Sequence, residues 1–109
     1  MKSFEAKIFV GFKETKTGVI HTIEECEQLC QKFVNINPQC VTVTPTKYIY
    51  TNGYEHGAII GLIQYPRFPT DELEIRAIAL KLANILLIEF NQSRVTVNFD
   101  DEVIMLSNE

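Results

Sequence analysis

The residues best suited to chemistry gather around one short turn. Asn52 and Gly53 form the strongest two-residue signal for a β-hairpin, and Glu55 and His56 follow directly. An imidazole beside a carboxylate and phenols is a combination used in general acid and base catalysis. We therefore identify Glu55 or His56 as the candidate base and Tyr50 as the candidate acid. The alternative is structural, because hairpin tips commonly carry polar and aromatic residues that stabilise the strand pair.

Other side chains near this turn form a candidate ligand-binding set. Tyr48 and Tyr54 are suited to stack on a planar ring, and Arg67 is suited to neutralise an anion. A small anionic ligand fits this set, whereas a long nucleic acid does not. The chain has 10 basic and 14 acidic residues, a net charge of -4, and lacks the aromatic and basic run of an RNA recognition module. We expect no nucleic-acid partner.

Three cysteines raise the question of a metal site. Cys26 and Cys30 stand one helical turn apart and could share a soft metal with Cys40 or His21. Zinc sites usually carry C-x-x-C pairs, which this sequence lacks, and both Cys26 and Cys30 fall on an apolar helix stripe where a free thiol fills the core. We therefore expect no metal, no cofactor and no disulfide framework.

Length and composition indicate one folded domain over residues 1–109. The chain is 46% hydrophobic and 22% charged, which is typical of a globular protein. The first residues lead straight into a strand pattern without the apolar segment of a secretory signal, and charged residues interrupt the apolar stretch from Leu73 to Phe90. We expect a cytoplasmic protein with no membrane contact. The sequence has no glycine-rich phosphate loop and no G-x-S-x-G motif, which argues against P-loop and serine-nucleophile chemistry.

Hydrophobic periodicity predicts the order of the elements. Alternation at every second position indicates strands, and apolar residues three and four positions apart indicate helices. In chain order we expect a strand over Phe4–Phe12, a helix from Thr22 to about Asn35, strands over Val41–Thr51 and Ala58–Tyr65, a helix that begins within Pro69–Glu72 and ends near Phe90, a strand over Arg94–Phe99, and a short strand over Val103–Leu106.

Local signals refine these elements. Thr22 and Glu25 form a capping box, in which each side chain bonds the main-chain amide of the other residue and fixes the start of a helix. Pro45 lacks an amide hydrogen, so its strand should lie at a sheet edge or contain a bulge. Gly57 and Gly61 should mark bulges or places where another group approaches the backbone closely.

The predicted order is that of the ferredoxin-like, split βαβ arrangement (βαββαβ). It implies an α+β fold in which a four-stranded antiparallel sheet carries two helices on one face, with the C-terminal strand as an optional addition. The other face of the sheet stays open and is the first place to look for a partner. The second helix is more apolar than one sheet requires, so we expect part of its surface to pack against another subunit.

The sequence resembles small uncharacterised α+β proteins of bacteria and their phages. The segments that carry this resemblance are Lys7–Phe12, Val41–Thr44, Tyr50–Gly53 and Gln92–Val97. The resemblance implies the fold and no particular activity. Tautomerases, copper chaperones and acylphosphatases of similar fold are disfavoured, because this chain lacks their N-terminal proline, C-x-x-C loop and early arginine, respectively. Ligand-sensing ACT-like domains and dimeric α/β-barrel oxygenases are not excluded.

These observations favour a non-catalytic binding or interaction module that forms a homo-oligomer and binds a protein or a small molecule. The first alternative is a small enzyme of isomerase or oxygenase type, with Glu55 or His56 as base and a hairpin tyrosine such as Tyr50 as acid. It requires these side chains to converge in one concave pocket. The second alternative, which rests on the resemblance alone, is a phage protein that blocks or sequesters a host component.

Overall fold

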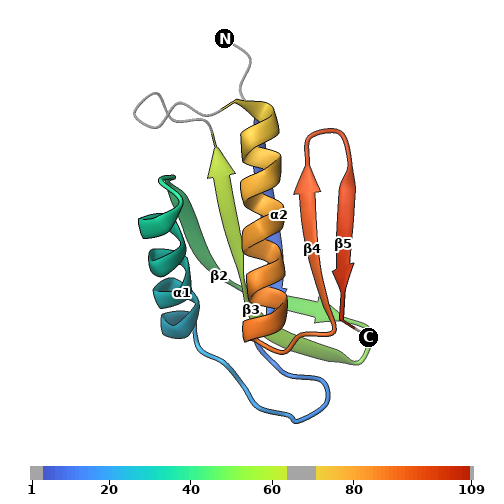
Figure 1. The fold of residues 1–109 in the computed structure, drawn as a ribbon. Coiled ribbons are helices and arrows are strands. Elements are labelled where there is room, and N and C mark those ends of the chain that lie inside the picture. The colour runs from blue at the N-terminus through green and yellow to red at the C-terminus, as the bar shows by residue number, and fades with distance from the viewer. Residues whose placement is uncertain (1–3, 64–70, 109) are drawn as a thin grey trace.

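The computed structural model describes residues 4–63 and 71–108. Its elements, in chain order, are β1 (Glu5–Gly11), α1 (Ile23–Ile36), β2 (Val41–Tyr50), β3 (Gly53–Ile63), α2 (Glu72–Glu89), β4 (Arg94–Phe99) and β5 (Val103–Ser107). The strands form one antiparallel sheet in the order β2-β3-β1-β4-β5. Both helices lie on the same face of this sheet (Figure 1). The predicted ferredoxin-like α+β fold is confirmed, and the optional C-terminal strand is present as β5 at the sheet edge.

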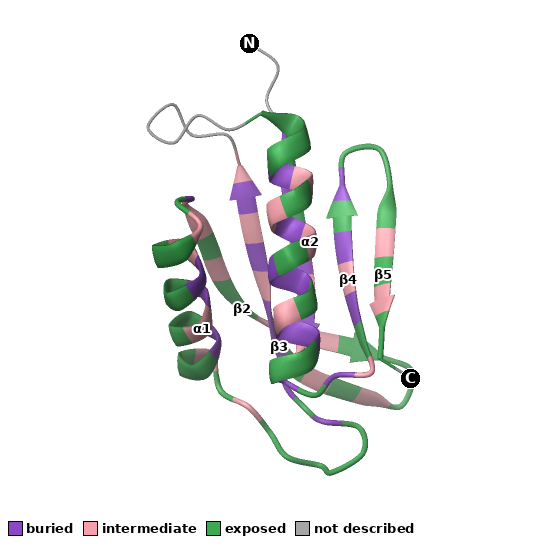
Figure 2. Ribbon diagram, viewed as in Figure 1, coloured by how far each residue is buried: buried purple, intermediate pink, exposed green. Residues whose placement is uncertain are grey.

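The core lies between the two helices and the inner face of the sheet. Buried positions alternate with more exposed ones along β1 and β4, as the period of a strand requires (Figure 2). α1 packs over β2 and β3, and α2 packs over β1 and β4. The buried hydrophobic strand residues are Ala6, Ile8, Val10, Ala58, Ile60, Leu62, Val95, Val97 and Phe99.

The start of each helix is fixed by a side chain that bonds the first turn. Thr22 and Glu25 form the predicted capping box at α1, and the Asp71 side chain accepts from the Glu74 amide at α2. Residues 64–70, which include the predicted end of the returning strand and the first half of the predicted cap segment of α2, lie outside the described residues. Cys26 and Cys30 are buried in the core, as predicted.

α2 buries half of its apolar residues, partly buries others and leaves a few exposed. Ile75, Leu82 and Leu86 are fully buried, whereas 77% of Leu73 and 58% of Ile88 are exposed. No helix in residues 4–63 and 71–108 is both long enough and apolar enough to span a bilayer. Self-association through the exposed residues remains a prediction.

The β2–β3 hairpin is longer than predicted. β3 begins at Gly53 rather than at Ala58, because the register continues without a bulge from Val41 opposite Leu62 to Tyr50 opposite Gly53. Sequence alternation is weak over residues 53–57, where polar residues and glycines replace the apolar pattern. β2 is an edge strand, which accommodates Pro45 as predicted. Figure 1 shows the far end of the hairpin bending toward the end of the molecule where β4 begins.

Gly57 marks a close approach of other groups to the backbone. A Cβ atom at this position would lie 2.2 Å from the Val10 carbonyl oxygen and 2.6 Å from a ring carbon of Tyr48. At Gly61 the nearest atom, at 2.5 Å, is the hydroxyl of Thr42, which can rotate away. The prediction that another group approaches the backbone closely is therefore confirmed for both glycines. The predicted bulge is absent, because the pairing of β3 with β2 is continuous.

These contacts predict different costs for two glycine substitutions. Gly57→Ala should lower the free energy of unfolding by about 2 kcal/mol, because both the β1 backbone and the Tyr48 ring must move. Gly61→Ala should change the free energy of unfolding little. The Thr42 side chain can rotate away from the new methyl group, and the lower conformational entropy of the unfolded chain favours folding. Urea denaturation of both variants measures the difference. Equal losses for the two variants would contradict the role given to Gly57.

Candidate active site

Two hollows in the surface share the side chain of Glu55. The first, which we call the aromatic hollow, has a volume of about 460 Å³ and lies beside the end of the β2–β3 hairpin; it is lined by Phe12, Lys13, Ile20, Tyr50, Gly53, Tyr54, Glu55 and His56. The second, which we call the polar hollow, has a volume of about 380 Å³ and is lined by Thr15, Glu55, Gln92, Ser93 and Arg94. Glu55 thus stands between a largely aromatic surface and a surface of hydroxyl, amide and guanidinium groups.

The Glu55 carboxylate occupies space that is open only because Gly11 has no side chain. A Cβ atom at Gly11 would lie 1.7 Å from Glu55 Oε2. Gly11 pairs with Gly57 across β1 and β3, and Glu55 stands two residues before Gly57 on the same sheet face. This cross-strand pair of glycines therefore makes room for a carboxylate on the sheet surface.

The environment of Glu55 favours its neutral form. The side chain is half-buried, and among the described residues no hydrogen bond reaches its carboxylate. Desolvation raises the pKa of Glu55, and the nearby charge of Lys13 offsets only part of this effect. A carboxylate with a raised pKa and no donor in contact is a stronger base than an ordinary surface glutamate, which suits a group that accepts a proton.

Both exposed hairpin tyrosines line the aromatic hollow, from positions on opposite faces of the strand pair. The Tyr50 ring lies over Gly53, where a Cβ atom would be 2.6 Å from a ring carbon, and its hydroxyl lies 3.4 Å from the Tyr54 carbonyl oxygen. Tyr54 packs edge-on against His56, with ring centroids 5.9 Å apart, and Lys47 Nζ lies 4.2 Å from the centre of the Tyr54 ring. Tyr50 and Tyr54 are both more than half exposed, so their rings are available to a ligand.

Tyr48 has a structural environment. Its ring lies over Gly57, and its hydroxyl donates to the Ala58 carbonyl oxygen at 2.8 Å. Burial raises the pKa of Tyr48 to about 12, so its phenol stays protonated at neutral pH. Tyr48 does not line either hollow.

The structure brings most of the predicted candidates together, in an arrangement that the sequence did not reveal. Tyr50, Tyr54, Glu55 and His56 all line the aromatic hollow. Because successive side chains of a strand point to opposite faces, Glu55 and His56 do not form a contacting pair, and no hydrogen bond joins them in the described residues. The remaining candidate, Arg67, lies outside the described residues.

Sequence reasoning missed the segments that complete the walls of the site. The loop after β1 contributes Lys13 and Thr15, and the turn after α2 contributes Ser93 and Arg94. The available signal was the register of the hairpin, since continuing the return strand back to Gly53 places Glu55 near the end of β1. In the described part of the chain, no group of three or more His, Cys, Asp or Glu side chains is placed to hold a metal ion.

Comparison with solved structures identifies enzymes of the same fold. A phage SAM lyase in complex with S-methyl-5′-thioadenosine matches with a TM-score of 0.77 and 18% sequence identity over 98% of this chain and 91% of that chain. A phage SAM lyase in the apo state matches with the same TM-score and identity over 97% and 90% of the two chains. No family model matches this chain, and no curated protein matches it. The similarity covers nearly the whole chain and shows a shared fold.

This comparison corrects the preferred functional interpretation. The prediction of a non-catalytic interaction module is contradicted, because the two solved structures that match nearly the whole chain are those of an enzyme. The enzyme alternative, based on Glu55, His56 and Tyr50, agrees better with the comparison, although its isomerase and oxygenase reactions are not those of a lyase. The phage origin of the similar structures agrees with the phage element of the sequence resemblance.

The desolvation of Glu55 predicts a pH-dependent effect on stability. A carboxyl with a raised pKa binds a proton more readily in the folded than in the unfolded chain, so it lowers stability as the pH rises from about 4.5 through the raised pKa. Glu55→Gln should therefore have a higher urea midpoint than the wild type at pH 7.5 and a similar one at pH 4. Glu27→Gln, at an exposed position of α1, should match the wild type at both pH values. A lower midpoint for Glu55→Gln at pH 7.5 would show that the carboxylate is stabilising.

Proposed function

We propose that this protein is a lyase that binds S-adenosylmethionine across the two hollows and cleaves it to release S-methyl-5′-thioadenosine. The observation that carries the proposal is the position of Glu55, a half-buried carboxylate with a raised pKa at the junction of an aromatic and a polar hollow. The substrate class is taken from the phage SAM lyase, whose fold matches over nearly the whole chain and whose structure contains S-methyl-5′-thioadenosine.

The two hollows have the chemistry that the two halves of this substrate require. An adenine ring stacks well on aromatic side chains, which Tyr50 and Tyr54 supply. The methionine end carries a carboxylate, for which Lys13 and Arg94 supply positive charge at the two hollows. The sulfonium centre between these halves is positive, and Glu55 lies between the hollows. The net charge of -4 also favours the approach of a cationic substrate.

The product defines which bond breaks. S-methyl-5′-thioadenosine keeps the adenosyl group, the sulfur and the methyl group, so cleavage occurs between the sulfur and the Cγ of the four-carbon amino acid chain. The electron pair of this bond passes to sulfur and cancels its positive charge. Two routes without added water balance with the groups at this site: the four-carbon fragment loses a proton from Cβ and forms an alkene, or its own carboxylate attacks Cγ and closes a lactone ring. In the proposed reaction, Glu55 accepts the Cβ proton in the route to the alkene. In both routes its negative charge binds the sulfonium group of the substrate.

Incubation with S-adenosylmethionine tests this activity directly. We expect the wild type to release S-methyl-5′-thioadenosine, measured by liquid chromatography, and mass spectrometry of the four-carbon product to distinguish the alkene from the lactone. Glu55→Gln should lower kcat roughly 100-fold or more, because the base or the charge at the reacting centre is lost. Glu27→Gln, a carboxylate remote from both hollows, should retain full activity. Failure of the wild type to release the thioether, or full activity of Glu55→Gln, would refute the assignment.

Ligand binding tests the aromatic hollow separately. Tyr54→Leu should weaken the binding of S-methyl-5′-thioadenosine about tenfold in isothermal titration calorimetry, because an aromatic ring that stacks on the adenine is removed. Leu73→Ala, which removes an exposed apolar side chain of α2 outside the hollows, should leave the affinity unchanged. Equal affinities of Tyr54→Leu and the wild type would place the adenine elsewhere.

A further inference from the structure

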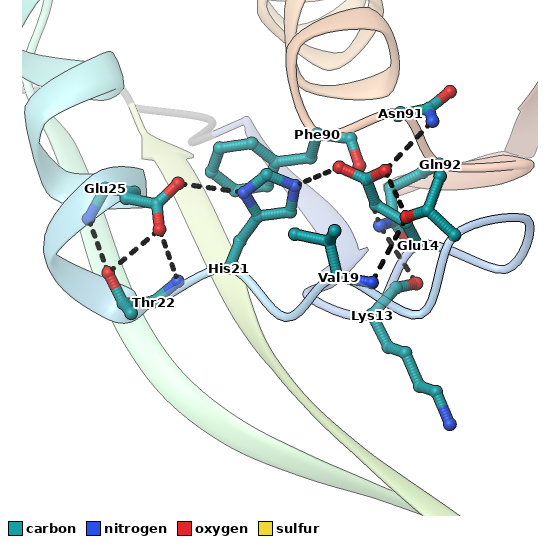
Figure 3. A network of polar contacts seen from close by, with 10 residues as sticks. Lys13, Glu14, Val19, His21, Thr22, Glu25, Phe90, Asn91 and Gln92 are labelled. Atoms are coloured by element: carbon teal, nitrogen blue, oxygen red, sulfur yellow. Dashed lines mark hydrogen bonds and ion pairs between the residues drawn. The ribbon is translucent and has the colours of Figure 1, made fainter.

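A polar network centred on His21 joins the walls of the two hollows. His21 Nε2 lies 2.6 Å from Glu14 Oε2, and His21 Nδ1 lies 2.8 Å from Glu25 Oε2 (Figure 3). The imidazole also stacks on Phe90 at the end of α2, with ring centroids 4.6 Å apart and the planes 7° from parallel. The side chain is 12% exposed, so water competes little for these contacts.

The geometry of these contacts requires a protonated imidazole. A neutral histidine has one N–H donor and one lone pair, whereas His21 places a carboxylate oxygen against each ring nitrogen. In the neutral form, one of these nitrogens would direct its lone pair at a carboxylate. Hydrogen bonds lower the pKa of Glu14 and of Glu25, so both carboxyl groups are ionised, and both contacts are then hydrogen bonds only when His21 is an imidazolium that donates to the two together.

Glu14 extends the network into the loop that follows β1. Its carboxylate accepts from the Thr17 hydroxyl at 2.7 Å and from Asn91 Nδ2 at 3.0 Å. The Thr17 hydroxyl oxygen in turn accepts from the Val19 amide. We call residues 12–21 the 12–21 loop. These hydrogen bonds join residues within the loop and tie the loop to the turn after α2.

The same loop supplies walls to both hollows. Phe12, Lys13 and Ile20 line the aromatic hollow, and Thr15 lines the polar hollow. The turn that Asn91 belongs to continues into Gln92, whose Nε2 donates to the Lys13 carbonyl oxygen at 3.2 Å. Fixing the 12–21 loop thus fixes the spacing between the two walls on either side of Glu55.

We propose that His21, as an imidazolium, is a positioning residue that holds the 12–21 loop in place, so that the two hollows are assembled only while this side chain is protonated. The part of this inference that concerns catalysis rests on the proposed function. The charged groups facing His21 are Glu14 from the loop and Glu25 from α1, while Phe90 and Asn91, from the end of α2 and the turn after it, carry no charge.

The direction of the pH dependence follows from these partners. Burial by itself lowers the pKa of His21, but the hydrogen bonds to Glu25 and Glu14 outweigh it and raise the pKa above the ordinary value of 6.5. The pKa of Glu14 is lowered by its bonds to Asn91, Thr17 and His21, so it stays ionised. The stabilisation is therefore complete below pH 6.5 and is lost as the pH rises through the raised pKa of His21.

Hydrogen exchange measured by NMR tests the inference without any substrate. The amides of Glu14, Gly18 and His21 donate to loop carbonyl groups, so their protection factors report whether the loop is closed. In the wild type these factors should fall about tenfold as His21 deprotonates, a titration that is simple to assign because the chain has only 2 histidines. Protection that does not change through this titration would overturn the proposal.

Three variants separate positioning from general destabilisation. His21→Gln should show low loop protection at every pH. Glu14→Gln should move the midpoint of the wild-type transition to lower pH, because one carboxylate partner is lost, and it carries the test if His21→Gln does not fold. Glu24→Gln, which removes an exposed carboxylate outside the network, should behave as the wild type. Equal midpoints for Glu14→Gln and Glu24→Gln would overturn the proposal.

Kinetics then connect the loop to the site. The KM for S-adenosylmethionine should rise about tenfold across the same midpoint, with a smaller change in kcat, and His21→Gln should show the high KM throughout. A KM that stays constant across the pH range in which loop protection falls would refute the positioning role. If the wild type cleaves no S-adenosylmethionine at any pH, the proposed function fails, while the exchange data still decide whether His21 closes the loop.

Discussion

Gly11 and Gly57 face each other across the two central strands, and the candidate site depends on the space that their missing side chains leave. The Glu55 carboxylate fills this space over Gly11, and the Tyr48 ring fills it over Gly57. The rest of the sheet buries apolar side chains against two helices, which keeps both backbones in register. A carboxylate is thereby held on a rigid surface and partly removed from water, at a cost in stability that a site needing a reactive group can bear.

The walls of the site differ in how firmly they are held. The floor belongs to paired strands whose positions are set by continuous ladders of hydrogen bonds and by the core beneath them. The 12–21 loop instead depends on a few polar contacts around one imidazolium. The molecule thus combines a rigid floor with a wall that we propose responds to protonation, a division consistent with the lower local stability of binding loops in general.

Much of the fold was predictable because its signals are local. The capping box of Thr22 and Glu25 and the turn at Asn52 and Gly53 are fixed by neighbouring residues, and alternation identified the strands. The site was harder to predict because its geometry is not local. Glu55 acquires its environment from Gly11 on another strand, and the partners of His21 come from a loop, a helix and a distant turn. The preferred interpretation as a non-catalytic module failed for the same reason, since no short motif carries the chemistry.

The contact between Glu55 and Gly11 also bears on how such proteins evolve. A β-carbon at position 11 would occupy the place of the carboxylate oxygen, so a substitution there would turn the flexible Glu55 side chain out of its present position. A lineage that keeps the carboxylate in this position must keep the glycine, whereas one that loses the acid is released from the restriction. At 18% identity to a protein of the same fold, overall likeness says little about shared chemistry. This coupled pair offers a more discriminating marker of common descent in function.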